Sequence, residues 1–254
     1  MLRRASREYV LEQRLRPNKA LGQNFFIDAP RLIASLDNLD FSQRPVLEIG
    51  AGLGGLTELL LERTSTVMAI ELDGELAKRL ENETKAEVIC ADAQKLNTDF
   101  ITQEWFIAGN LPYYITTPLV EKYLLTPARN HLYMVQQEAG ERFFAKPSNK
   151  NYGVIAIITS LFFDAQTLDT LPPSCYYPEP PITSSLIYLH RKGDIPAGFV
   201  SFIKTCLRMR RKTLHNNLKG MDGAEAAFRE LNISPSIRAE ALTPQQFLAL
   251  FKSI

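Results

Sequence analysis

The chain has 254 residues, of which 45% are hydrophobic and 22% charged, and this composition excludes an intrinsically disordered protein. The 29 basic and 28 acidic side chains leave a formal net charge of +1, so the overall charge does not point to a nucleic-acid partner. The three cysteines lie far apart and the three histidines are isolated, which fits neither a disulfide framework nor a metal site. The first ten residues carry no apolar run of signal-peptide length, and no run of about 18 apolar residues occurs in the sequence, so we expect a cytoplasmic protein without a membrane partner.

The first 20 residues are rich in arginine and lysine and carry a weak helical pattern that ends at Pro17. The basic side chains outnumber the acidic ones, Glu8 and Glu12, and they are Arg3, Arg4, Arg7, Arg14, Arg16 and Lys19. We predict a mobile basic arm at residues 1–20, which is a candidate for phosphate contacts.

From residue 45 onward, short apolar runs alternate with helical patterns. This alternation is typical of an α/β fold, in which helices cover both faces of a parallel sheet. The expected strands are 45–50, 66–71, 87–90, 104–108 and 131–135, and the expected helices are 57–63, 75–83, 117–125 and 152–163.

Two later apolar runs, 165–171 and 184–189, flank a proline-rich turn, so we expect them to pair at the edge of the sheet. After a linker at 193–198 the pattern is helical only, and a long helix is predicted at 199–218. We therefore divide the chain into the arm at 1–20, an α/β domain at 21–192 and a small helical domain at 193–254.

The segment EIGAGLGG at residues 48–55 follows a strand and opens a helix, where glycines allow the backbone to approach a nucleotide-type ligand. Glu71 ends the next strand, where a carboxylate can accept hydrogen bonds from both ribose hydroxyls. These features suit NAD and S-adenosylmethionine alike, and a plain tight turn is the alternative. Asp92 ends the third strand and can accept a hydrogen bond from an adenine amine, although aspartate there is more often a helix N-cap.

The segment NLPY at residues 110–113, at the end of the fourth strand, points to a methyl acceptor. The exocyclic amine of a base is a poor nucleophile because its lone pair is delocalised into the ring. The Asn110 side-chain oxygen and a backbone carbonyl of Leu111 or Pro112 can accept both amine hydrogens, and Tyr113 offers a ring on which the base can stack. Proline at position 112 fixes the backbone that aims the carbonyl. This chemistry favours S-adenosylmethionine over NAD, because hydride transfer has no use for such a segment.

Several segments together resemble the KsgA family of small-subunit ribosomal RNA adenine dimethyltransferases, and the resemblance extends from about residue 19 to the C-terminus. They are LGQNF at 21–25, EIGAG at 48–52, NLPY at 110–113, VQQE at 135–138, YG at 152–153 and RRKT at 210–213. The resemblance implies a seven-strand Rossmann-like class I methyltransferase sheet with a small all-helical C-terminal domain. It also implies that S-adenosylmethionine supplies methyl groups to two neighbouring adenosines in the 3′-terminal hairpin of 16S ribosomal RNA. The partner would be a pre-ribosomal 30S particle, bound by a monomeric enzyme.

In that family the segment matching residues 23–26 covers the cofactor, which implies contacts from Asn24 and Phe26. The full expected cofactor-binding set is Asn24, Phe26, Gly50, Gly52, Glu71, Leu72, Asp92, Ala93 and Asn110. The chain departs from the family at Ala51, where proline is usual, and at Phe26, where leucine is usual. It also has Tyr176 where the family has a phenylalanine thought to sandwich the target base, and tyrosine keeps the stacking face.

A basic stripe is expected on the predicted helix at 199–218. Its members recur at helical spacing opposite an apolar face, and they are Lys204, Arg208, Arg211 and Lys212, followed by His215. Such a stripe is ordinarily the solvated side of an amphipathic helix, but beside an adenine-methylating site it is a candidate for RNA phosphate contacts.

Two alternatives stay open. An Erm-type enzyme acting on large-subunit RNA usually reads NIPY and lacks the RKTL segment, whereas this chain has Leu111 and RKTL at 211–214. A ribosome-assembly factor on the same scaffold would tolerate the loss of Asn110 or of the glycine loop, and both are intact here.

Overall fold

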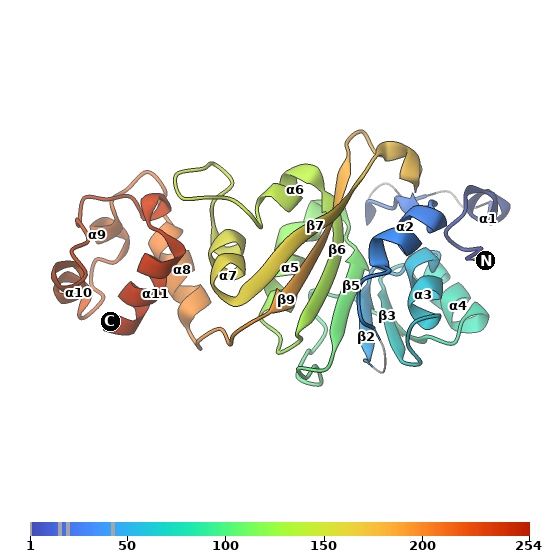
Figure 1. Cartoon of the computed structure of the whole chain (residues 1–254), viewed down its shortest axis with the longest axis horizontal. Coiled ribbons are helices and arrows are strands. Elements are labelled where there is room, and N and C mark those ends of the chain that lie inside the picture. The colour runs from blue at the N-terminus through green and yellow to red at the C-terminus, as the bar shows by residue number, and fades with distance from the viewer. Residues whose placement is uncertain (1, 15–16, 19–20, 42–43) are drawn as a thin grey trace. The chain divides into compact units, whose positions relative to one another are not determined.

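The computed structural model describes residues 2–14, 17–18, 21–41 and 44–254, and the chain forms two compact units (Figure 1). The first unit comprises Met1–Gly140 and Gln166–His190, and the second comprises Glu141–Ala165 and Arg191–Ile254. The domain boundary expected after residue 192 lies close to the observed boundary at Arg191. Residues 141–165, which were expected in the α/β domain, belong to the second unit instead. None of the described helices is both long and apolar enough to span a membrane.

A seven-stranded sheet organises the first unit, with the strand order β4-β3-β2-β5-β6-β9-β7 (Figure 1). The strands from β2 to β6 pair in parallel, and β9 pairs antiparallel with β6. Their bounds are β2 Val46–Ile49, β3 Val67–Glu71, β4 Glu87–Cys90, β5 Phe106–Asn110, β6 Asn130–Gln136, β7 Phe163–Leu171 and β9 Ser184–Arg191. The predicted strands are present, and the predicted pairing of the two late runs is confirmed because β7 lies next to β9.

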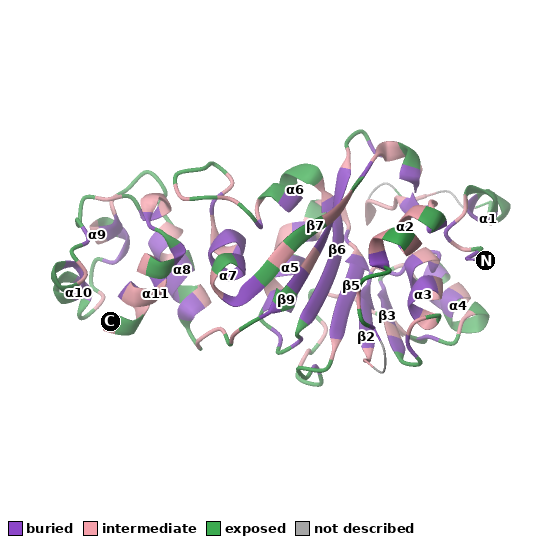
Figure 2. Cartoon of the chain, in the orientation of Figure 1, coloured by how far each residue is buried: buried purple, intermediate pink, exposed green. Residues whose placement is uncertain are grey.

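Helices lie on both faces of this sheet, as predicted. They are α2 Ala29–Leu36, α3 Gly55–Leu61, α4 Gly74–Glu83, α5 Thr116–Leu124 and α6 Gln137–Glu141. The central strands are buried over most of their length (Figure 2), because both faces of a parallel sheet are covered. The carboxyl ends of β2 to β5 therefore meet at one edge, and the loops that follow them carry the glycine segment, Glu71, Asp92 and NLPY.

The N-terminal segment is folded over its described residues. Helix α1, Arg7–Glu12, begins after Ser6, whose side chain accepts a hydrogen bond from the Tyr9 N–H at 3.2 Å. Leu2 and Ala5 are buried in the main core, and Tyr9 is buried in a smaller cluster. Because these apolar side chains are interspersed among the arginines, the segment differs from the mobile arm that its charge suggested. Arg16 and Lys19, which belong to the same prediction, lie outside the described residues.

Helices dominate the second unit. They are α7 Val154–Phe162, α8 Phe199–Leu207, α9 Leu214–Asn217, α10 Ala224–Glu230 and α11 Pro244–Ser253. Helix α7 contacts α8 and α11, and the ring of Phe199 lies 6.0 Å from that of Phe162 and 5.2 Å from that of Phe251. Helix α7 is apolar over most of its surface and needs such cover, which explains why residues 141–165 join this unit.

The prediction of one long helix at 199–218 is wrong, because α8 ends at Leu207 and a new helix starts at Leu214. Thr213 caps the new helix by accepting the Asn216 N–H at 3.3 Å. The side-chain amide of the buried Asn217 accepts a hydrogen bond from the Met209 N–H at 3.0 Å and donates one to the Met209 carbonyl at 3.3 Å. These side-chain bonds satisfy the backbone of a turn at 208–213, so the basic residues there do not form one helical stripe.

Candidate active site

A cavity opens at the carboxyl ends of β2, β3 and β5 and encloses about 1010 Å³, part of it open to solvent. Every residue of the expected cofactor-binding set lines it, together with the NLPY segment. These residues are Asn24, Phe26, Gly50, Gly52, Glu71, Leu72, Asp92, Ala93, Asn110, Leu111, Pro112 and Tyr113. The structure therefore brings together residues that lie up to 89 positions apart in the chain, from Asn24 to Tyr113.

Glu71, at the end of β3, holds the glycine loop that follows β2. The carboxylate of Glu71 accepts the N–H of Gly52 at 2.7 Å and that of Asp73 at 2.9 Å. Burial raises the pKa of Glu71, and these two N–H groups oppose the rise by stabilising the charged form. Gly52 has φ +57°, and a Cβ there would lie 3.3 Å from the ring of Phe25, so glycine is required for two reasons.

An adenosine-bearing ligand fits this part of the cavity. The Glu71 carboxylate accepts these two N–H groups, and a backbone hydrogen bond from Leu72 also stabilises its charge. Because a carboxylate has about four acceptor sites, Glu71 can still accept a ribose hydroxyl. The side chain of Leu72 is 48% exposed and lines the cavity, so it offers an apolar surface to a base. Asp92 caps a helical turn by accepting the Gln94 N–H at 2.9 Å, and it lines the cavity as well. Asp92 can therefore cap the turn and also accept a hydrogen bond from an adenine amine.

The segment at residues 21–26 covers the cavity and is anchored on several sides. Its Gln23 amide donates to Asp73 at 3.0 Å. Strand β1, Phe25–Phe26, pairs antiparallel with β8, Tyr176–Tyr177. The side-chain amide nitrogen of Asn110 donates to the backbone carbonyl of Asn24 at 2.9 Å. This last bond orients the amide of Asn110, so its oxygen is the atom left to accept a hydrogen bond.

The NLPY segment leaves the sheet through a 3₁₀ turn, Tyr113–Ile115, which leads into α5. The N–H of Leu111 donates to the Met134 carbonyl at 3.0 Å. The carbonyl of Pro112 already accepts the Ile115 N–H at 3.2 Å and the Thr116 hydroxyl at 3.0 Å. Of the two carbonyls that the sequence left open, that of Leu111 is the one that no neighbouring donor uses among the described residues.

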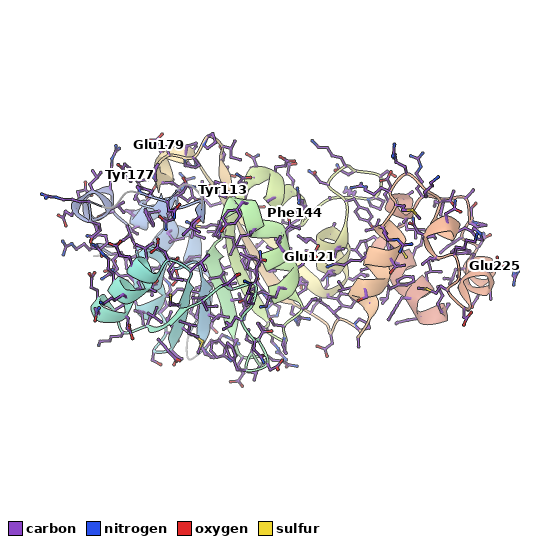
Figure 3. All side chains as sticks on the ribbon, turned by 180° about the vertical axis from the view of Figure 1, so that it is seen from behind. Tyr113, Glu121, Phe144, Tyr177, Glu179 and Glu225 are labelled. Atoms are coloured by element: carbon purple, nitrogen blue, oxygen red, sulfur yellow. The ribbon has the colours of Figure 1, made fainter. Side chains whose placement is uncertain are left out.

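Two tyrosines flank this segment differently. Tyr113, whose side chain is labelled in Figure 3, lines the cavity. Its hydroxyl forms a hydrogen bond of 2.9 Å with Ser184, and burial raises its pKa. Tyr176 is 1% exposed and does not line the cavity; its ring packs edge-on against Phe26 at 5.4 Å. The Tyr176 hydroxyl is buried and has no hydrogen-bond partner in the part of the chain that the structure describes. The structure thus places Tyr176 behind the covering segment rather than in the cavity.

Glu48 is a site residue that the sequence analysis did not single out. It is 1% exposed, lies on the central strand β2 and lines the cavity. Burial raises its pKa to about 8, and its Oε2 atom has no hydrogen-bond partner among the described residues. The available signal was a carboxylate inside an otherwise apolar strand run, VLEI at 46–49.

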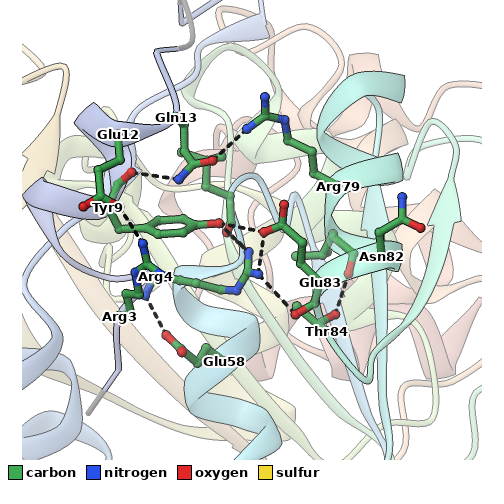
Figure 4. Close-up of polar contacts among 12 residues, drawn as sticks. Arg3, Arg4, Tyr9, Glu12, Gln13, Glu58, Arg79, Asn82, Glu83 and Thr84 are labelled. Carbon is green, nitrogen blue, oxygen red and sulfur yellow. Dashed lines mark hydrogen bonds and ion pairs between the residues drawn. The ribbon is translucent and has the colours of Figure 1, made fainter.

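Arg4 also lines the cavity, and it ties the N-terminal segment to the glycine loop (Figure 4). Its guanidinium donates to the Leu53 carbonyl at 3.1 Å, to the Tyr9 hydroxyl at 2.8 Å and to the Glu83 carboxylate at 2.7 Å. Its backbone N–H donates to Glu58 at 2.7 Å. Arg4 therefore acts as a structural anchor, which its position in a run of basic residues did not reveal.

The residues expected to contact RNA lie in the second unit. Lys204 is on α8, Arg208 caps the end of that helix, and Arg211 and Lys212 lie in the turn that follows. All four are exposed. Their neighbour Arg210 is engaged within the unit, because it donates to Glu240 at 3.0 Å and to the Lys150 carbonyl at 3.1 Å.

Comparison with known proteins identifies relatives along nearly the whole chain. The ribosomal RNA small subunit methyltransferase A of Clostridium acetobutylicum is 35% identical over 263 residues and covers 95% of each protein. The protein of the same name from Mycoplasma mobile is 32% identical over 249 residues, covering 92% of this chain and 96% of the relative.

Solved structures show the same fold. A dimethyladenosine transferase from Plasmodium falciparum matches with a TM-score of 0.71 at 22% identity, over 87% of this chain and 94% of the other. The 23S rRNA methyltransferase ErmE matches with a TM-score of 0.64 at 22% identity, over 91% of this chain and 99% of the other. The class I methyltransferase fold and S-adenosylmethionine as cofactor, both predicted from the sequence, are confirmed.

The sequence model of the family described as ribosomal RNA adenine dimethylase matches residues 14–254. The chain therefore belongs to the ribosomal RNA adenine dimethylase family and is an S-adenosylmethionine-dependent methyltransferase that dimethylates adenine in ribosomal RNA.

Proposed function

We propose that the enzyme dimethylates two adjacent adenosines in the 3′-terminal hairpin of small-subunit ribosomal RNA, acting as a monomer on a pre-ribosomal 30S particle in the cytoplasm. The relatives that carry the name ribosomal RNA small subunit methyltransferase A support the choice of subunit. The intact RKTL segment, which separates this chain from the Erm type, supports it independently.

In this proposal the residues along β2, β3 and β4 hold the cofactor. Glu71 accepts the ribose hydroxyls, Asp92 accepts from the adenine amine with Ala93 beside it, and Leu72 packs against the base. Gly50 and Gly52 allow the backbone to approach closely, while Asn24 and Phe26 cover the ligand. When bound, S-adenosylmethionine supplies an electrophilic methyl group; the remaining chemistry belongs to the side chains and carbonyls of this chain.

The observation that carries the proposal is the orientation of Asn110. Because the side-chain amide nitrogen of Asn110 donates to the Asn24 carbonyl at 2.9 Å, the Asn110 amide oxygen remains as an acceptor for the target amine. The Leu111 carbonyl is the second acceptor, since the Pro112 carbonyl is already used twice. Two acceptors that hold both amine hydrogens draw the nitrogen lone pair out of the ring and aim it at the methyl group.

The target base stacks on Tyr113, whose ring is fixed by its hydrogen bond with Ser184. Tyr176, which the family resemblance assigns to the opposite face of the base, supports the ring of Phe26 from behind, against which it packs edge-on at 5.4 Å. Lys204, Arg208, Arg211 and Lys212 contribute phosphate contacts from the second unit.

The test is to map dimethylated adenosines in ribosomal RNA from a strain that lacks this protein. We expect the modification to be absent from the small-subunit hairpin and restored by the wild-type chain. The Asn110→Ala variant serves as the matched control, because it should assemble particles without restoring dimethylation. Loss of a modification in large-subunit RNA instead would overturn the proposal, and restoration of dimethylation by Asn110→Ala would overturn the role of Asn110.

A further inference from the structure

A half-buried lysine joins two parts of the site. Lys122 lies on α5, and its ammonium group donates hydrogen bonds to the backbone carbonyls of Ala93 at 2.9 Å, Gln94 at 2.9 Å and Leu96 at 2.6 Å. A lysine ammonium has three donors, and all of them are used here. Burial lowers the pKa of Lys122, and the nearby charge of Asp92 opposes this effect.

The three carbonyls belong to one helical turn that follows β4. Asp92 starts the turn, because its carboxylate accepts the Gln94 N–H at 2.9 Å and its carbonyl accepts the Lys95 N–H at 2.9 Å. The carbonyls at the other end of such a turn carry partial negative charge and lack intrahelical donors. Lys122 caps that end, so the turn is fixed at both its ends.

A second side chain of α5 reaches the same turn. The hydroxyl of the fully buried Tyr123 donates to the Ala93 carbonyl at 3.0 Å. The Ala93 carbonyl therefore accepts bonds from two consecutive residues of one helix. The other end of that helix is joined to NLPY, because the Thr116 hydroxyl donates to the Pro112 carbonyl at 3.0 Å.

We propose that Lys122 is a positioning residue that sets the adenine-recognising turn at Asp92–Ala93 in register with the methyl-accepting NLPY segment, using α5 as the rigid connection. The proposal rests on the proposed function, in which Asp92 accepts from the cofactor adenine amine. Lysine suits this role because its single tetrahedral nitrogen directs three N–H donors at three carbonyls. The planar guanidinium of arginine does not present its donors in that arrangement.

The test compares binding of S-adenosylhomocysteine with binding of its inosine counterpart, in which a keto oxygen replaces the adenine amine, by calorimetry on the full chain. The wild type should prefer the amino compound. In Lys122→Met we expect affinity for S-adenosylhomocysteine to fall about tenfold or more and the preference to be largely lost, because Asp92 is no longer held in place. Amide hydrogen exchange at 93–96 should accelerate, while exchange in β2 and β5 stays unchanged.

Lys78→Met is the matched control, because Lys78 is an exposed lysine on α4 and donates to none of the three carbonyls. It should keep the wild-type affinity and preference. Lys122→Arg should keep the positive charge but lose the preference for S-adenosylhomocysteine over the inosine compound. If Lys122→Met does not fold, Lys122→Gln replaces it, since a shorter, neutral amide with two N–H donors cannot satisfy the three carbonyls and should also lose most of the preference.

Two outcomes are distinguished by this design. Wild-type preference in Lys122→Met, or in Lys122→Gln where that variant is used, would overturn the role of Lys122. A wild-type protein that binds S-adenosylhomocysteine without preferring it to the inosine compound would instead overturn the proposed role of Asp92.

Discussion

The side-chain amide of Asn110 donates a hydrogen bond of 2.9 Å to the backbone carbonyl of Asn24, which lies 86 residues earlier in the chain. This bond joins the segment that covers the cofactor cavity to the segment expected to hold the target amine. One side chain therefore serves two functions: its nitrogen secures the cover, and its oxygen is left for the substrate. Loss of Asn110 should affect both.

For Asn110→Ala we expect the methylation rate to fall by about 100-fold or more, because the lost acceptor matters most in the transition state. RNA affinity should barely change, since phosphate contacts supply most of it. Single-turnover rates and filter binding measure the two quantities, and hydrogen exchange at 22–26 should rise as the cover loosens. Equal losses of rate and RNA affinity would make Asn110 a structural residue.

Replacement of Glu71 tests the cofactor site. Glu71→Ala should weaken binding of S-adenosylhomocysteine by about 1.5 to 3 kcal/mol, because ribose contacts and the hydrogen bond to the Gly52 N–H are lost together. Calorimetry with S-adenosylhomocysteine and with NAD provides the comparison, and the wild type should not bind NAD. Glu75→Ala, at an exposed position on α4, is the control and should bind normally.

Glu48 should make the stability of the ligand-free protein depend on pH. Its pKa is raised from 4.5 to about 8 by burial, so between these values the folded chain keeps a proton that the unfolded chain releases. The free energy of unfolding should therefore fall as pH rises from 4.5 to 8, by up to about 1.4 kcal/mol per pH unit, and level off above pH 8.

Urea unfolding of the wild type, Glu48→Gln and the exposed control Glu62→Gln measures this slope. Glu48→Gln should flatten it in that window, whereas Glu62→Gln should not. Parallel slopes for all three proteins would show that Glu48 ionises normally.

Tyr176→Phe removes a buried hydroxyl that has no hydrogen-bond partner among the described residues. We expect unchanged or slightly higher stability, by up to about 1 kcal/mol, because an unsatisfied polar group is lost while the ring still packs against Phe26. Methylation should persist, since the ring face is kept. Tyr176→Ala should lower stability by about 3 to 5 kcal/mol through the cavity it creates. Thermal melts combined with methylation assays separate these effects.

The basic residues of the second unit are tested by salt dependence. If Arg208 and Lys212 contact phosphates, changing both to Gln should reduce the slope of log affinity against log salt by roughly 0.7 to 0.9 per lost contact. Cofactor affinity should not move. Arg229→Gln and Lys252→Gln, which replace exposed basic residues of the same unit, should leave the slope intact. An unchanged slope in Arg208→Gln with Lys212→Gln would remove this turn from the RNA interface.

The strands, the glycine loop and the NLPY segment could be predicted from sequence patterns, because each depends on residues that lie close together in the chain. The sequence also predicted that Glu71 and Asp92 lie at one edge of the sheet, where the structure has them lining the cavity, since parallel strands bring their carboxyl ends together. Which NLPY carbonyl is available could not be predicted in this way, because the answer depends on Thr116 and Ile115 donating to the Pro112 carbonyl in the folded chain. Likewise, α8 ends at Leu207 because Asn217 folds back on Met209, and Arg4 is an anchor because Glu83 lies beside it. Such contacts join residues that local patterns treat as independent, so their pairing emerges only when the chain is packed.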